Sequence, residues 1–181
     1  MLKTSAKDIT VLDPSETVCK IAGFLRLGEL HMNDVKSMVA NVYARVLQNR
    51  ADIRGLRIID HGNATGCQLG RDFVTTTNFN YHSYELSKLK GAFCPYTGFA
   101  QMQHCLAGRN TPLLAQFALL WNVPVYAGLW YTNPFGVNMF GYEFEGALTG
   151  TPKAIPNPLK GFQQWVRVDP NGKVTPNVTV P

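Results

Sequence analysis

The stretch "GLRIIDHGNATG", residues 55–66, decides the fold, because a compact apolar run ends abruptly in small and polar residues. The apolar part predicts a strand, and the residues after Asp60 predict a polar turn. His61 and Gly62 therefore stand at the carboxyl end of a strand. In sheets of mainly parallel strands, ligands bind at that end of the strands. The position of His61 fits a role in chemistry, and it also fits a plain turn.

Hydrophobic periodicity predicts strands and helices in alternation along the chain. Strands are expected in "DITVLDP" (8–14), "IRGLRIID" (53–60), "TGFAQMQHC" (97–105), "VPVYAGLWY" (123–131) and "QQWVRV" (163–168), with a hairpin turn in "DPNGKV" (169–174). Helices are expected at 15–28, from an N-cap at Asn33 or Asp34 to about 50–52, at 84–90 and at 110–122, with Pro112 at the first helical position. The segment "CQLGRDFV" (67–74) is expected to pair with the strand at 53–60 or to lie at a sheet edge.

This alternation predicts an α/β fold with three layers, in which helices cover both faces of a mainly parallel sheet. The 181 residues, 45% of them hydrophobic, suffice for one domain with a sizeable core. We expect a single domain over 1–181, with its core at about 8–130 and a part rich in loops and short strands at 131–181.

The charge and hydropathy of the sequence limit the kinds of partner that we expect for this protein. The net charge of +5 comes from scattered basic residues without a basic run, so no nucleic-acid partner is indicated. No apolar stretch is long enough to span a membrane, and the start of the sequence lacks a secretory signal, so we expect a soluble protein and favour the cytoplasm. Charged residues make up only 16% of the chain, which indicates either a weakly charged surface or an apolar surface covered by a partner or a second copy.

The four cysteines, Cys19, Cys67, Cys94 and Cys105, are too few and too irregularly spaced for a disulfide framework. The groupings of His61 with Cys67 and of His104 with Cys105 match no familiar metal-ligand spacing. We therefore expect reduced thiols, no metal and no cofactor.

One Cys–His pair has the placement that nucleophilic catalysis requires. Cys105 follows the strand "GFAQMQ" (98–103) as His61 follows the strand "GLRIID" (55–60), so in neighbouring parallel strands both would lie at one edge of the sheet. Alternation directs His104 away from Cys105, which leaves His61 as the base. The N–H groups of Gly62 and Cys105 would hold an oxyanion.

Two further residues are candidates for support at this edge. Asp60 would orient His61 if it did not face the opposite side of the strand. Arg109 would bind an acidic substrate group or form a surface ion pair.

These residues resemble the caspase signature Q-A-C-[RQG]-G, which has its histidine about 50 residues upstream. The chain has "QHCLAG" at 103–108 and "DHG" at 60–62, with His104 in place of Ala and the Gly one residue late. Over Leu56 to Trp130 the chain is similar to the bacterial caspase-like domains found at the front of very large surface proteins. These domains read as a strand, "HG", a short "LG" segment, a helix, a strand, "GC" or similar, a Gly-rich turn, a long helix and a strand. The resemblance implies a caspase–hemoglobinase fold and a peptidase that uses His61 and Cys105 on a polypeptide substrate.

Other interpretations stay open at this point. Cys105 could be a small core residue, and the fold could serve as a catalytically silent binding, regulatory or effector module. The thiol could also serve acyl transfer or deamidation. The aromatic stretch "GLWYTNPFGVNMFGYEF" (128–144) could line a substrate pocket or belong to the core.

Overall fold

The structure, a computed structural model, describes residues 6–15, 30–129 and 165–181. It also describes the backbone of four two-residue strands, β9 (Tyr131–Thr132), β10 (Asn138–Met139), β11 (Tyr142–Glu143) and β12 (Lys153–Ala154), which pair as β9–β10 and β11–β12. The helix expected at 15–28 and most of the aromatic stretch at 128–144 lie outside the described residues.

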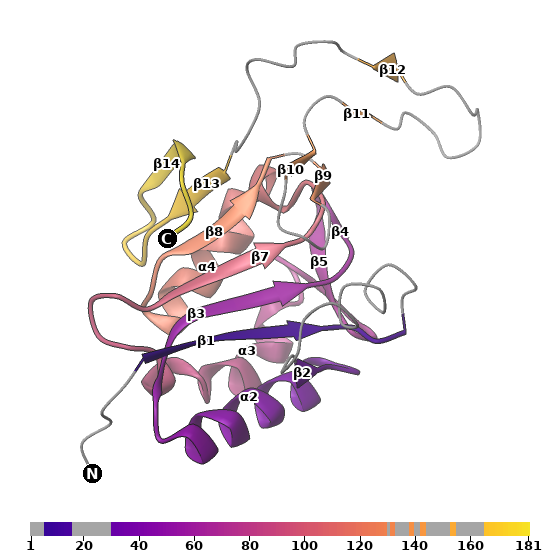
Figure 1. Cartoon of the computed structure of the whole chain (residues 1–181). Coiled ribbons are helices and arrows are strands. Elements are labelled where there is room, and N and C mark those ends of the chain that lie inside the picture. Colours follow the sequence, from indigo (N-terminus) through magenta and orange to yellow (C-terminus); the bar gives the residue numbers. More distant parts are fainter. Residues whose placement is uncertain are drawn as a thin grey trace.

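A seven-stranded sheet forms the centre of the fold (Figure 1). Its strands are β1 (Ala6–Leu12), β2 (Leu30–His31), β3 (Asp52–Ile59), β7 (Phe99–Gln103), β8 (Val125–Gly128), β13 (Trp165–Val168) and β14 (Val174–Val178). They lie in the order β14-β13-β8-β7-β3-β1-β2. The strands from β2 to β8 run parallel, whereas β13 and β14 are antiparallel to their neighbours. The expected α/β fold with a mainly parallel sheet is confirmed.

Three helices, α2 (Val35–Asn49), α3 (Phe79–Ser87) and α4 (Thr111–Trp121), pack on one face of this sheet. Their buried side chains share one core with residues from that face, such as Ile58 and Met102. Neighbouring strand residues project to the other face, where Phe99, Tyr126 and Trp165 form a separate cluster. No described helix is both long and apolar enough to cross a membrane.

The helix ends follow local sequence signals. Asp34 caps α2 by accepting the N–H of Ser37 at 2.7 Å, and the Ser37 hydroxyl accepts the N–H of Asp34 at 3.0 Å. Asn110 caps α4 by accepting the N–H of Leu113 at 3.2 Å. The expected start of α2 is confirmed, with Asp34 rather than Asn33 as its cap. α4 begins at Thr111, so Pro112 lies at its second position and not at the predicted first.

The boundaries of α3 differ from the prediction. It begins at Phe79 and ends at Ser87, whereas the sequence predicted 84–90, and Gly91 lies in the short 3-10 helix η1 (Lys90–Ala92). Phe79 explains the earlier start, because its ring packs edge-on against Phe117 of α4 with centroids 4.9 Å apart. This tertiary contact stabilises a first turn whose residues, Phe, Asn, Tyr and His, have only modest helix propensity.

The segment "CQLGRDFV" does not join the main sheet, so the predicted pairing with the strand at 53–60 is wrong, whereas its second half lies at the edge of a smaller sheet, as the alternative prediction had it. It forms the hairpin β5 (Gly66–Leu69) and β6 (Asp72–Thr75), which pairs with β4 (Gly62–Asn63) in a separate three-stranded sheet. The turn of this hairpin packs on the start of α2, where Arg71 N–H donates to the Asn33 carbonyl at 2.8 Å. Its position is therefore fixed by a helix end rather than by a strand edge.

Gly70, in this turn, is predicted to tolerate no side chain. Its φ is +64°, and a Cβ would overlap the backbone of Asn33 and Asp34. We expect Gly70→Ala to lower the free energy of unfolding by about 2 kcal/mol or more, through overpacking and left-handed strain. Urea unfolding measures the change. Gly91→Ala is the matched control, because a Cβ there meets nothing within 4 Å; equal stability losses in the two variants would contradict the prediction.

Candidate functional site

The register between β3 and β7 brings His61 and Cys105 to the same edge of the sheet. Ile59 lies opposite Gln103 in the parallel ladder, and His61 and Cys105 each follow two residues later. Continuing the alternation of both strands places the two side chains on the face opposite the three helices. His61 is exposed and Cys105 is half-buried, so a ligand can approach both.

Gly62 lies against the chain that carries Cys105. A Cβ on Gly62 would stand 2.8 Å from Cβ of His104 and 3.3 Å from the carbonyl oxygen of Cys105. Its partner across β4 and β5 is Cys67. Because Gln68 N–H donates to the His61 carbonyl at 2.9 Å, the next pair, Gly62 and Cys67, is a non-hydrogen-bonded one. The Gly62 N–H therefore points away from β5.

The peptide groups of Gln68 connect the segment that carries His61 to the segment that carries Cys105. Gln68 N–H binds the His61 carbonyl, and the Gln68 carbonyl accepts a hydrogen bond of 2.7 Å from Nε2 of His104. A carbonyl only accepts, so the His104 ring carries its proton on Nε2. β5 thus connects the backbone of His61 to the residue directly before Cys105.

His104 is fully buried, on the helix side of β7 with Ala100 and Met102, as the alternation predicted. Burial lowers the pKa of His104 to about 4, so the ring is neutral at physiological pH. Its hydrogen bond to Gln68 and its burial make it part of the framework. Of the two histidines at this edge, His61 is the one that solvent reaches.

Asp60 also fixes the backbone of this edge. Its carboxylate oxygens accept the N–H of His61 at 2.7 Å and the N–H of Gly70 at 2.8 Å. Asp60 is buried, and that burial raises its pKa to about 6 although both hydrogen bonds favour the ionised form. Asp60 therefore ties the start of β4 to the hairpin turn that rests on α2.

A tight turn follows Cys105 and leads into α4. Leu106 has a φ of +59°, and the short helix η2 (Ala107–Arg109) comes next. Gly108 packs on the end of β8, because a Cβ there would lie 2.8 Å from the backbone of Gly128. Asn110 Nδ2 donates to the Thr65 carbonyl at 3.0 Å and so connects this turn to the β4–β5 turn.

Arg109 lies exposed at the same edge of the sheet. Its Nε donates to the Leu129 carbonyl at 3.0 Å, which anchors the guanidinium just beyond β8. A cation held there stands beside the strand ends that carry the candidate residues.

The other described cysteines lie in different surroundings. Cys67 is buried, and burial raises the pKa of its thiol to about 12, which makes it unreactive. Cys94 accepts a hydrogen bond from the Thr97 hydroxyl at 3.1 Å, in the segment before β7 and so at the opposite end of that strand. Cys67, Cys94 and Cys105 are all thiols rather than disulfides. Cys19 lies outside the described residues.

The sequence predicted His61, Gly62 and Cys105 as site residues, and the structure brings them to one edge of the sheet; the sequence did not indicate Gln68. Gln68 acts through its peptide groups, and no residue type signals that role. Within the described parts of the chain, no three His, Cys, Asp or Glu side chains gather into a metal site. Neither a protein-family model, nor a curated protein, nor a solved structure matches the chain. The chemistry of the site is therefore inferred from its residues.

Asp60 and His104 are predicted to affect stability with opposite pH dependence. At pH 5 the native Asp60 holds a proton that the unfolded chain has released, so its contribution to stability falls as pH rises from about 4 to 6. The native His104 at pH 5 lacks a proton that the unfolded chain holds, so its contribution rises from about pH 4 to 6.5. In the middle of each pH range, the contribution to the free energy of unfolding changes by up to about 1.4 kcal/mol per pH unit.

Two variants separate these contributions. Relative to the wild type, we expect the stability of Asp60→Asn to rise with pH between 4 and 6, and that of His104→Gln, which keeps an N–H donor, to fall. Denaturant unfolding at half-unit pH steps gives both differences. Slopes of the same sign for the two variants would show that one of the two groups is not buried as the structure has it.

Proposed function

We propose that the chain is a cysteine peptidase with a caspase–hemoglobinase-like fold, in which Cys105 is the nucleophile and His61 the acid–base. The observation that carries this proposal is the register of β3 and β7, in which His61 and Cys105 each come two positions after the last paired residues, Ile59 and Gln103. A thiol and an imidazole at one edge are the groups that acyl transfer through a thioester requires.

The order of elements supports the finer fold assignment. After β3 come His61 and Gly62, a hairpin containing Leu69 and Gly70, and helix α3. β7, Cys105, a turn, the long helix α4 and β8 follow. This is the order of the caspase-like domains that the sequence resembles. We also propose, as part of this fold, a third layer of helices on the face of the sheet opposite α2, α3 and α4.

The proposed reaction uses the Cys105 thiol, the His61 ring and two backbone N–H groups. The thiol of Cys105 passes its proton to His61, and the thiolate attacks the carbonyl carbon of a peptide bond. The N–H of Gly62, which points away from β5, and the N–H of Cys105 stabilise the oxyanion that forms. His61 then gives the proton to the leaving amine, and the C–N bond breaks. Water hydrolyses the thioester and restores the thiol.

The buried groups around the dyad keep it in place without reacting. Asp60 and Gln68 bind the backbone on either side of the His61 ring, and His104 binds Gln68. Arg109 is the candidate contact for an acidic group of the polypeptide substrate, because its guanidinium is exposed at this edge. The chemistry needs no cofactor.

The proposal predicts that Cys105 reacts faster with iodoacetamide than Cys94 does. Both thiols are half-buried, so Cys94 is an internal reference for access. Replacement of His61 by Ala should slow the alkylation of Cys105 about tenfold near neutral pH, because the thiol then lacks the imidazole that takes its proton in the proposed dyad. Peptide mapping by mass spectrometry follows each cysteine separately.

A matched control and an activity assay complete this test. His31→Ala removes another exposed histidine, from β2, and should leave the alkylation of Cys105 unchanged. Cys105→Ala should abolish cleavage of a peptide library or of the chain itself. Release of ammonia from glutamine side chains without peptide cleavage would show a deamidase instead. Alkylation of Cys105 at the rate of Cys94, unaffected by His61→Ala, would leave a catalytically silent module.

A further inference from the structure

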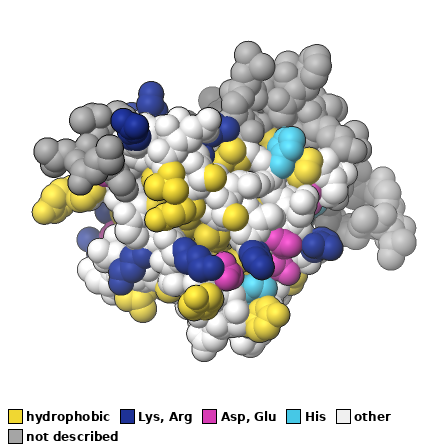
Figure 2. Space-filling model, turned by 90° about the horizontal axis from the view of Figure 1, so that it is seen from below, with side chains coloured by type: hydrophobic (Ala, Val, Ile, Leu, Met, Phe, Trp, Pro, Cys, Tyr) yellow, Lys and Arg dark blue, Asp and Glu magenta, His cyan; other side chains and the backbone are white. Residues whose placement is uncertain are grey.

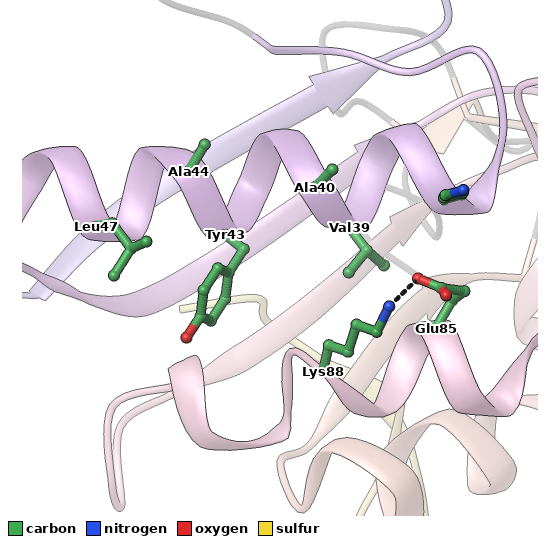
Figure 3. A pocket seen from close by; sticks show the side chains of 8 residues that line it. Val39, Ala40, Tyr43, Ala44, Leu47, Glu85 and Lys88 are labelled. Atoms are coloured by element: carbon green, nitrogen blue, oxygen red, sulfur yellow. Dashed lines mark hydrogen bonds and ion pairs between the residues drawn. The ribbon is translucent and has the colours of Figure 1, made fainter.

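A groove lies between α2 and α3 on the side of the molecule that the helices form (Figure 3). We call it the α2–α3 groove; its volume is about 650 Å³ and its lining residues are Lys36, Val39, Ala40, Tyr43, Ala44, Leu47, Glu85 and Lys88. Figure 3 shows Val39, Tyr43 and Leu47 projecting from α2 toward α3, with Lys88 and Glu85 across from Val39. The lining is mostly apolar, and charged groups lie at its rim.

Helix α2 carries two apolar stripes where a helix that covers a sheet needs one. The first is buried and contains Val35, Met38, Val39, Val42 and Val46. The second, Ala40, Tyr43, Ala44 and Leu47, follows the spacing i, i+3, i+4 and i+7 on the exposed side.

The exposed stripe is a sizeable apolar surface. Tyr43 is 45% exposed and Leu47 is 61% exposed. Tyr84, 74% exposed, and Tyr81, 85% exposed, lie on α3 outside the lining of the groove. Figure 2 shows hydrophobic side chains gathered beside lysines and arginines on this side of the molecule. Contiguous apolar surface with a polar rim marks an interaction site.

The charges at the rim select the partner. Glu85 is the only carboxylate in the lining, and Lys88 holds it at 2.7 Å. The ammonium of Lys88 also lies over the ring of Tyr84, 4.9 Å from its centroid. Lys36 at the end of the groove has no ion-pair partner among the described carboxylates. The rim therefore presents excess positive charge next to an apolar floor.

We propose that the α2–α3 groove binds an amphipathic α-helix of a partner protein whose apolar stripe is flanked by acidic residues. The α2 residues that line the groove, from Lys36 to Leu47, span about 16 Å at 1.5 Å per residue, which equals about three helical turns. A partner helix presenting apolar residues at i, i+3 or i+4 and i+7 fits that length. Its acidic residues would pair with Lys36 and Lys88. Tyr43 in the lining supplies an aromatic contact of the kind that carries binding energy at protein interfaces.

This binding does not depend on the proposed peptidase chemistry, because the groove shares no residue with the site at the carboxyl ends of β3 and β7. The low charged fraction of the chain, 16%, agrees with a surface that a partner covers. Nucleic acid fits less well, since the basic residues of the chain form no run.

Two fluorescein-labelled 16-residue helical peptides test the proposal. Both carry leucine at i, i+3, i+4 and i+7 positions; one has glutamate and the other lysine at the flanking positions. Fluorescence anisotropy with the full chain should show saturable binding of the glutamate peptide, about tenfold tighter than that of the lysine peptide. Lys36→Glu should reduce this preference, whereas Lys7→Glu, the same charge change on the exposed start of β1, should not.

Ala44→Glu tests the groove itself, because a charged side chain would occupy the exposed stripe without touching the core. It should weaken the binding of the glutamate peptide about tenfold, while the circular dichroism spectrum and the melting temperature of the protein stay unchanged. Equal affinities for the two peptides, or no saturable binding, would overturn the proposal. If the chain self-associates and Ala44→Glu abolishes the self-association, the groove binds a second copy of the chain. If the chain binds anionic vesicles and Ala44→Glu abolishes that binding, the groove binds a membrane. Either result would also overturn the proposal.

Discussion

The register between β3 and β7 is the constraint on which the candidate site depends. With Ile59 opposite Gln103, the residues two positions further along each strand meet at one edge. A shift of one residue in either strand would send its side chains to the opposite face and separate His61 from Cys105. The register is well specified, because Leu56, Ile58, Ala100 and Met102 of these strands are all fully buried under the helices. The hydrophobic effect that forms the core thus also positions the polar edge.

A set of hydrogen bonds then fixes the edge beyond the strands. Asp60, Gln68 and His104 connect separate segments of this edge: the Asp60 carboxylate binds two backbone N–H groups, and the Gln68 peptide groups bind the His61 carbonyl and the His104 ring. Buried hydrogen bonds of this kind are costly to break, since each leaves a polar group without solvent. Burial raises the pKa of Asp60 and lowers the pKa of His104, so both side chains are mainly neutral near pH 5. The result is a rigid backbone around an exposed imidazole.

Much of this arrangement was predictable from the sequence, and the rest was not for identifiable reasons. The apolar runs predicted β3, β7 and β8, and capping residues predicted the starts of α2 and α4. The early start of α3 depends on the contact of Phe79 with Phe117, and the separate hairpin β5–β6 depends on the docking of Gly70 on α2. Both are tertiary contacts that no local pattern encodes. Strand ends indicated His61, Gly62 and Cys105, but the role of Gln68 was invisible because it is carried by peptide groups.

The most direct test of the account is chemical cross-linking of the dyad with 1,3-dibromoacetone, whose three-carbon bridge joins a thiol and an imidazole only when they are adjacent. After alkylation of Cys105, the second bromomethylene group should react with His61, and mass spectrometry should find one linked peptide pair containing both residues. His104 should not be labelled, because it is fully buried. Cys105 that carries only a hydrolysed single adduct, or that is linked to a residue other than His61, would contradict the pairing of these two side chains.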